Sequence, residues 1–79
     1  MNNSEFKQWL ISNTTYSTRV ISNVLSRLNR ADRIYSVRPE EVYLFELEHE
    51  EEFSKLSCAV KSQIRKAVKL YIQFSESKN

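Results

Sequence analysis

The 79-residue sequence has no glycine and a single proline, Pro39, so few positions can supply the backbone conformations that tight turns require. Small β-sheet proteins usually connect their strands through glycine-containing turns, which this chain cannot form. Its connections must be built from serine, threonine, asparagine and charged residues. The composition therefore argues against a many-stranded β-fold.

Cysteine is equally scarce, because Cys58 is the one thiol and cannot form a disulfide within the chain. A protein without such cross-links fits a reducing cytoplasm, and the first residues lack the basic cluster and apolar run of a secretory signal. No stretch approaches the roughly 20 apolar residues that cross a bilayer. We expect a cytoplasmic protein without a membrane segment, with Cys58 as a small residue of the core.

Patterns for catalysis and cofactor binding are also missing. The only histidine, His49, stands among glutamates and far along the chain from Cys58, which indicates neither a metal site nor a Cys–His pair. Without glycine there is no phosphate-binding loop. The consecutive carboxylates of residues 50–52 would point in different directions on a helix, which disfavours paired acid–base chemistry. We expect no enzyme activity, no cofactor and no small-molecule substrate.

What is present is an ordinary globular composition, with 41% hydrophobic and 28% charged residues. The length allows one domain, residues 1–79, ordered over about 4–75 with fraying ends. A chain this short buries only about 60% of the surface that it exposes when unfolded, so a few large side chains must supply the core. The expected ones are Phe6, Trp9, Phe53, Tyr71 and Phe74.

Apolar residues recur at helical spacing in two segments of the N-terminal half. Residues 5–12 form the first, with apolar positions at i, i+3 and i+4 and Ser4 as the expected N-cap. Residues 18–30 form the second and clearest one, with Ser17 or Thr18 as the cap. Its apolar positions are Val20, Ile21, Val24, Leu25 and Leu28.

The C-terminal half predicts further helices after a loop at residues 33–38. Pro39 suits a first helical position, and the glutamates that follow it favour the positive end of a helix dipole. The four apolar residues 42–45 also fit a buried strand, but a lone strand would have no partner, which favours a helix. Residues 50–56 fit a short turn and residues 57–75 a long last helix. We expect an all-α fold, a compact bundle of four to five short helices.

Charge is strongly segregated along the chain, although the net charge is only +2. Residues 1–39 carry six basic and two acidic side chains. Residues 40–52 carry seven acidic side chains and no lysine or arginine, whereas residues 53–79 carry six basic and one acidic. Such segregation favours surfaces of a single sign, which attract partners of the opposite sign.

The basic residues form two rows at helical spacing. One row lies opposite the apolar stripe of residues 18–30, and the other recurs along residues 57–75 without an interleaved carboxylate. Like charges at this spacing repel by roughly 0.2–0.5 kcal/mol per pair, so unpaired rows favour a polyanionic partner, most commonly nucleic acid. The expected DNA-contacting residues are Arg19, Asn23, Arg27 and Arg30, and then Lys61, Arg65, Lys66 and Lys69.

Two other interpretations stay open. One is that the two basic rows are ordinary solvent-facing helix surfaces. Any surface helix needs a polar face, and lysine and arginine are common there because they are good helix formers. The acidic middle segment could be solvated, could pair with Lys55 and its neighbours, or could contact a basic protein. Protein interaction is therefore the alternative function, through Glu46, Glu48, Glu50, Glu51 and Glu52.

The hydrophobic spacing resembles that of a known family of domains. The pattern consists of Phe6-x-x-Trp9-Leu10, then Ser17-Thr18 opening a helix with Ile21, Leu25 and Leu28, and finally Ala67-Val68-x-x-Tyr71-x-x-Phe74. It spans nearly the whole chain and is similar to the SAM-like N-terminal core-binding domain of tyrosine recombinases and phage integrases.

The resemblance implies about four short helices that form half of a clamp around duplex DNA, with helix faces on the phosphates and in the major groove. Carried over to this chain, the matching surfaces are the two basic rows. The family's catalytic domain has no counterpart in the sequence, and the acidic segment departs from the family's pattern. The expectation is therefore a non-catalytic DNA-binding module.

Overall fold

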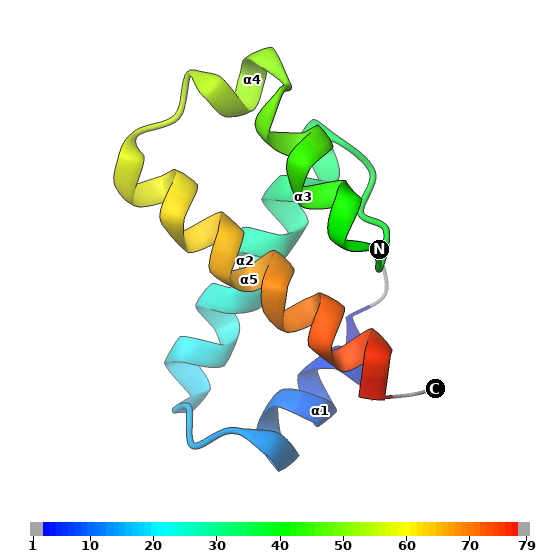
Figure 1. Cartoon of the computed structure of the whole chain (residues 1–79). Helices are drawn as coiled ribbons and strands as arrows, with labels where there is room; N and C mark the ends of the chain where they lie inside the picture. The colour runs from blue at the N-terminus through cyan, green and yellow to red at the C-terminus, as the bar shows by residue number, and fades with distance from the viewer. Residues whose placement is uncertain (1–2, 78–79) are drawn as a thin grey trace.

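The computed structural model describes residues 3–77, and its described part contains helices and no strand. The all-α prediction is therefore confirmed (Figure 1). The described helices are α1 (Ser4–Asn13), α2 (Thr18–Ile34), α3 (Glu41–Glu48), α4 (Glu51–Ser54) and α5 (Cys58–Ser77).

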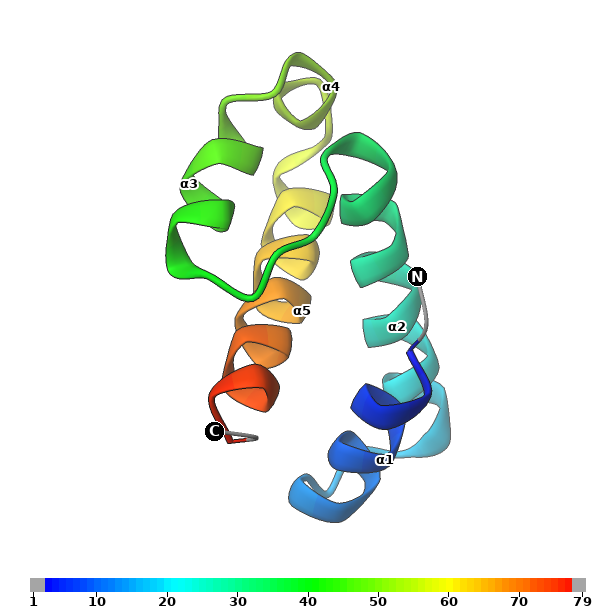
Figure 2. The same ribbon diagram turned by 90° about the vertical axis from the view of Figure 1, so that its right-hand side faces the viewer.

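The two longest helices, α2 and α5, cross in the middle of the molecule and share its most extensive helix–helix contact. Figures 1 and 2 show α1 at one end of this pair and α3 with α4 at the other. Each short helix therefore closes one end of a core that the crossing pair builds. This arrangement leaves the outer sides of α2 and α5 facing solvent over most of their length.

The core combines apolar side chains from all the helices. Three of the five expected core aromatics are buried, whereas Trp9 and Tyr71 are half-buried and pack around the ring of Phe6 or Phe74. Such ring contacts add to the free energy gained by burying apolar area. The buried residues are Phe6, Leu10, Ile21, Val24, Leu28, Ala31, Tyr43, Leu47, Phe53, Ile64, Ala67, Val68, Ile72 and Phe74.

The helix α2 starts where the sequence predicts and ends later. The Ser17 hydroxyl accepts the amide of Val20 at 3.3 Å, which confirms the N-cap. The helix continues to Ile34, so the predicted loop at residues 33–38 was wrong in its first two positions. Ala31 continues the buried stripe by one turn, and burial extends the helix beyond its strongest periodicity.

Two predicted helix starts are also corrected. Ser4 lies inside α1, and Asn3 takes the N-cap position while its side-chain amide donates to Asn29 on α2 at 3.0 Å. Pro39 is not a first helical residue, because Glu40 is still extended and α3 begins at Glu41. The expected fraying at the C-terminal end is wrong for Glu76 and Ser77, which belong to α5, and residues 1, 2, 78 and 79 lie outside the described part.

Residues 42–45 form a helix rather than a strand, as predicted. A helix cannot bury four consecutive side chains, because successive residues turn by about 100°. Tyr43 accordingly points into the core with no exposed area, and Leu44 is half-buried. Val42 and Phe45 remain 49% and 65% exposed.

The prediction that Cys58 is a core residue was wrong, since its side chain is exposed at the first position of α5. The inward side of this helix is defined by Ile64, Val68 and Ile72, and Cys58 lies away from that stripe. A small apolar residue near a helix start is therefore not enough to predict burial.

Tyr43 ties α3 to the end of α2. Its hydroxyl donates to the carbonyl of Tyr35 at 2.6 Å and lies 3.3 Å from the carbonyl of Ala31, while its ring stacks on Tyr35 with centroids 5.6 Å apart. Burial raises the pKa of Tyr43, so the hydroxyl stays a donor. The bond satisfies a carbonyl just beyond the end of α2, where the helix leaves acceptors without intrahelical partners.

We expect Tyr43→Phe to lower the free energy of unfolding by about 1–3 kcal/mol, because the Tyr35 carbonyl loses its donor in a partly buried position. Urea denaturation followed by circular dichroism measures this difference. Tyr71→Phe is the matched control, since the half-buried Tyr71 hydroxyl has no recorded bond in the described structure. Equal losses from both substitutions would contradict the assignment.

Candidate nucleic-acid interface

The outer face of α2 is made of arginine, asparagine and serine. Its one carboxylate, Asp32, is half-buried and accepts the amide of Val37 at 2.9 Å beyond the helix end. Asp32 is thus the single acidic side chain of α2, and it lies at the border of this face, bound to the backbone beyond the helix end. Its polar residues are Arg19, Ser22, Asn23, Ser26, Asn29, Arg30 and Arg33.

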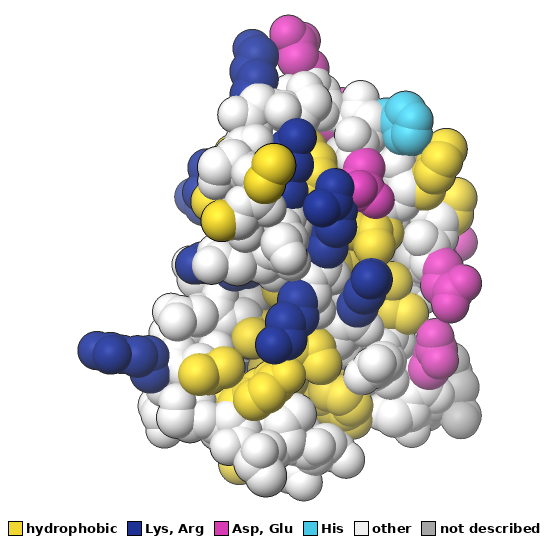
Figure 3. Space-filling model, turned by 60° about the vertical axis from the view of Figure 1, so that its left-hand side comes forward, with side chains coloured by type: hydrophobic (Ala, Val, Ile, Leu, Met, Phe, Trp, Pro, Cys, Tyr) yellow, Lys and Arg dark blue, Asp and Glu magenta, His cyan; other side chains and the backbone are white. Residues whose placement is uncertain are grey.

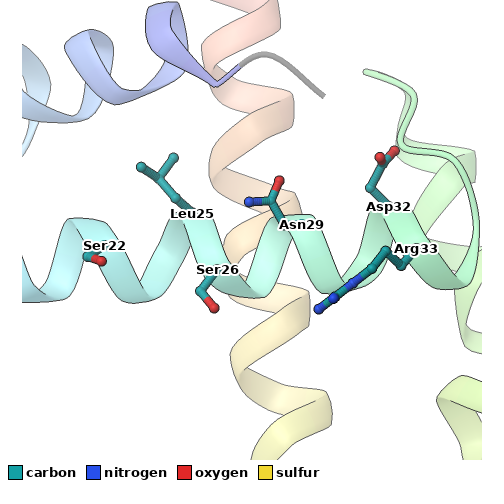
Figure 4. Close-up of a pocket in the computed structure, with 6 residues that line it drawn as sticks. All are labelled: Ser22, Leu25, Ser26, Asn29, Asp32 and Arg33. Atoms are coloured by element: carbon teal, nitrogen blue, oxygen red, sulfur yellow. The ribbon is translucent and has the colours of Figure 1, made fainter.

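Small side chains leave the surface of α2 open. Figure 4 shows Ser22 and Ser26 one turn apart on this helix, with Asn29 and Arg33 following along it. Together with Leu25 and Asp32 they line a shallow depression. Where its side chains are small, at Ser22 and Ser26, the helix can approach another molecule closely, and the hydroxyl and amide groups along it can donate and accept hydrogen bonds.

The row on α5 contains three lysines without a recorded ion pair among residues 3–77, namely Lys61, Lys66 and Lys69. Lys66 and Lys69 are exposed and line a shallow depression along the outer side of α5. The ammonium group of Lys66 lies 5.4 Å from the centre of the Tyr16 ring, in the connector before α2. This cation–π contact holds a positive charge near the start of α2.

Arg65 differs from the rest of its row, because it is engaged inside the protein. Its guanidinium donates to Glu48 on α3, with the closest N–O distance at 2.6 Å, and lies 5.7 Å from the centre of the Phe53 ring. The side chain is half-buried. Arg65 therefore fastens α3 and α4 to α5, and most of its charge is compensated.

One side-chain hydrogen bond joins the basic row of α2 to α5. The Nε of Arg27 donates to the side-chain carbonyl of Gln63 at 2.7 Å, so this arginine keeps its positive charge without a carboxylate partner. Figure 3 shows lysine and arginine side chains spread over this side of the molecule, with most acidic side chains at its top and right-hand edge and one in its upper part beside a basic side chain. The bond thus links the basic row of α2 to α5 through Gln63, which is not itself part of a basic row.

The acidic segment is partly compensated by intramolecular pairs. Glu46 accepts bonds from the guanidinium of Arg38 and from the Tyr35 hydroxyl, the latter at 2.6 Å. Glu48 binds Arg65, and Glu51 lies 3.5 Å from Lys55, as one of the sequence interpretations proposed. Of the five predicted protein-contacting glutamates, Glu50 and Glu52 are the ones without a recorded ion pair in the described residues.

The hydrogen bond from Tyr35 is the main reason why the pKa of Glu46 lies below its usual value, and the charge of Arg38 lowers it further. The same bond raises the pKa of Tyr35. Glu46 also raises the pKa of Arg38 by charge attraction. These three side chains fix the loop before α3 against α3 itself.

Sequence reasoning missed Arg33 as a member of the basic face. The residue was placed in a loop, whereas the longer α2 carries it on the helix, exposed and three positions after Arg30. The spacing i, i+3 was the available signal, because it continues the same row by one turn. The missing information was the true end of the helix.

Neither a metal-binding cluster nor a membrane-spanning helix is found among residues 3–77. They contain no group of three histidine, cysteine or carboxylate side chains placed to hold a metal ion. The ring nitrogen Nδ1 of His49 lies 2.8 Å from the carbonyl of Phe45. None of the described helices is both long and apolar enough to span a bilayer.

We expect Glu46→Gln to lower the free energy of unfolding at neutral pH, because the variant loses the ion pair with Arg38. The folded pKa of Glu46 lies below its usual value of 4.5, so its contribution is complete above that pH and is lost as the pH falls through the folded pKa. Denaturant unfolding at several pH values should show the gap between wild type and variant closing in acid. Glu52→Gln controls for the loss of one carboxylate, and a gap that persists in acid would contradict the assignment.

Comparison with known proteins adds no relative: no family model, no curated protein and no solved structure matches the chain. The functional assignment therefore depends on the surface itself, on its charges and on the helices that carry them.

Proposed function

We propose that this protein is a non-catalytic module that binds duplex DNA through its basic surface. The basic surface is defined here by the outer face of α2 and the free lysines of α5. The observation that carries the proposal is a set of cations on two packed helices that have no carboxylate partner in the described structure. The basic surface consists of Arg19, Asn23, Arg27, Arg30, Arg33, Lys61, Lys66 and Lys69.

A polyanion is the partner that such a surface fits best. Uncompensated cations on a folded protein repel one another, and phosphates remove that repulsion while releasing counterions from the nucleic acid. A globular anionic protein would supply fewer and less regular charges. The regular row along α2 therefore favours a regular array of phosphates.

Duplex DNA suits the shape of α2 as well as its charge. The 17 residues of the helix span about 25 Å, and an exposed helix with small side chains fits the major groove, which is about 12 Å wide. Arginine and asparagine can donate to base edges, and serine can bond to phosphates or bases. The lysines of α5 would contact backbone phosphates beside the groove.

The resemblance to integrase core-binding domains supports the same proposal, because those domains grip duplex DNA with helix faces. Two structural features refine the expectation for this chain. Arg65 is bound to Glu48 and contributes little free charge, whereas Arg33 joins the exposed row. The pairing of Glu46 and Glu48 with arginines also reduces the repulsion between the acidic segment and phosphates.

We expect the double substitution Arg30→Gln with Lys66→Gln to weaken duplex binding about tenfold or more near 0.1 M salt. The slope of log affinity against log salt should fall by about two, because two phosphate contacts are lost. Fluorescence anisotropy with a labelled duplex of about two helical turns, across a salt series, measures both quantities.

The matched control is Lys7→Gln with Arg38→Gln, which removes the same net charge outside the basic surface. Lys7 lies on α1, and Arg38 pairs with Glu46 on α3. The control is expected to keep most of the affinity and the salt slope of the wild type. Absence of wild-type binding at low salt, or equal losses in both double variants, would overturn the proposal.

A further inference from the structure

The outer side of α3 exposes large apolar side chains in an acidic setting. Val42 and Phe45 lie one turn apart and are 49% and 65% exposed. The imidazole of His49, one further turn along, lies against the Phe45 ring with centroids 4.5 Å apart. We call these three residues the α3 face. Large exposed apolar side chains that are adjacent on one helix are typical of an interaction site.

The surface beside the α3 face is hollowed. A groove runs between α3 and the C-terminal half of α5, with Leu44 and Ile72 as its apolar members. Its polar lining comes from Glu41, Lys69, Gln73 and Glu76. An apolar ridge next to a groove offers complementary shapes for a partner's side chains, which a flat apolar patch does not.

The charge around the α3 face determines which partner fits. Glu40 and Glu41 at the start of α3 are exposed and have no recorded ion pair in the described structure. A second α3 face would bring carboxylates against carboxylates, so symmetric pairing through α3 is disfavoured. The partner surface must instead be apolar with basic side chains around it.

This chain carries such a surface at the beginning of α2. Val20 is 38% exposed in the first turn, four positions after the half-buried Tyr16, whose ring lies under Lys66. Arg19 is exposed beside them. Figure 3 shows hydrophobic side chains next to lysine and arginine side chains on the lower part of this face. We call Tyr16, Arg19, Val20 and Lys66 the α2 entry face.

We infer that a second copy of the chain is the occupant of the α3 face, which docks on the α2 entry face of its neighbour. The contact joins two different surfaces, so a dimer keeps one α3 face and one α2 entry face unoccupied and can add another neighbour at either. It also covers Arg19 and Lys66 of the basic surface. The neighbour's acidic helix and DNA therefore compete for the same positive charges.

Sedimentation equilibrium of the full chain tests the contact directly. We expect the average mass to rise above that of one chain as concentration increases toward about 1 mM, and to rise less in high salt, where charge attraction is screened. Phe45→Ser should weaken the association about tenfold or more, because an aromatic anchor is lost. Ile11→Ser, at a residue 51% exposed on α1, is the matched control and should leave it unchanged.

A mixing experiment tests which surfaces meet. Phe45→Ser removes the α3 face, and Arg19→Glu with Lys66→Glu removes the α2 entry face, so each variant alone should be a monomer. Mixed in equal amounts, they retain one intact pair of complementary faces and should form a heterodimer that grows no further. Circular dichroism verifies that both variants are folded.

A wild-type chain that stays monomeric at about 1 mM in low salt would overturn the inference, leaving the α3 face to a foreign basic protein. A mixture of the variants that stays monomeric would overturn it as well. Both results are independent of DNA binding, because Phe45→Ser leaves the basic surface intact and can be tested with duplex separately.

Discussion

The packing of α2 against α5 is the constraint on which the rest of the structure depends. The chain has no disulfide, and α1, α3 and α4 are too short to be stable alone, so they are held by the core that the crossing pair creates. Leu28 on α2 and Ile64 and Val68 on α5 are fully buried. Burying these apolar stripes orients the opposite sides of both helices toward solvent. The basic surface is therefore a geometric consequence of the core.

Periodicity predicted the helices well, because each apolar stripe faces the same core. It predicted their ends less well, since an end depends on contacts that the local sequence does not reveal. At α2, burial of Ala31 and the bond from the Val37 amide to Asp32 decide where the helix stops. The exposure of Cys58 likewise depends on which side of α5 meets α2, and no local pattern specifies that.

The composition of the basic rows could also be predicted, but the availability of each charge could not. Arg65 and Glu48 are 17 positions apart, and the sequence alone does not reveal that they pair. The bond between Arg27 and Gln63 joins positions 36 residues apart and similarly depends on the crossing of α2 and α5. Pairing of distant charges is a tertiary property, so a row seen in the sequence gives an upper limit to the free charge of a surface.

Segregation of charge along the chain has two consequences in the folded protein. Carboxylates are concentrated in α3 and α4, where Glu46 and Glu48 compensate arginines from neighbouring elements and fasten the short helices. The same concentration keeps carboxylates off the exposed side of α2. If the seven acidic residues of the middle segment were spread over all helices, their fields would cancel those of the basic rows. A short chain can thus carry a strongly positive surface at a net charge of only +2, because seven of its ten carboxylates lie in one segment, residues 40–52.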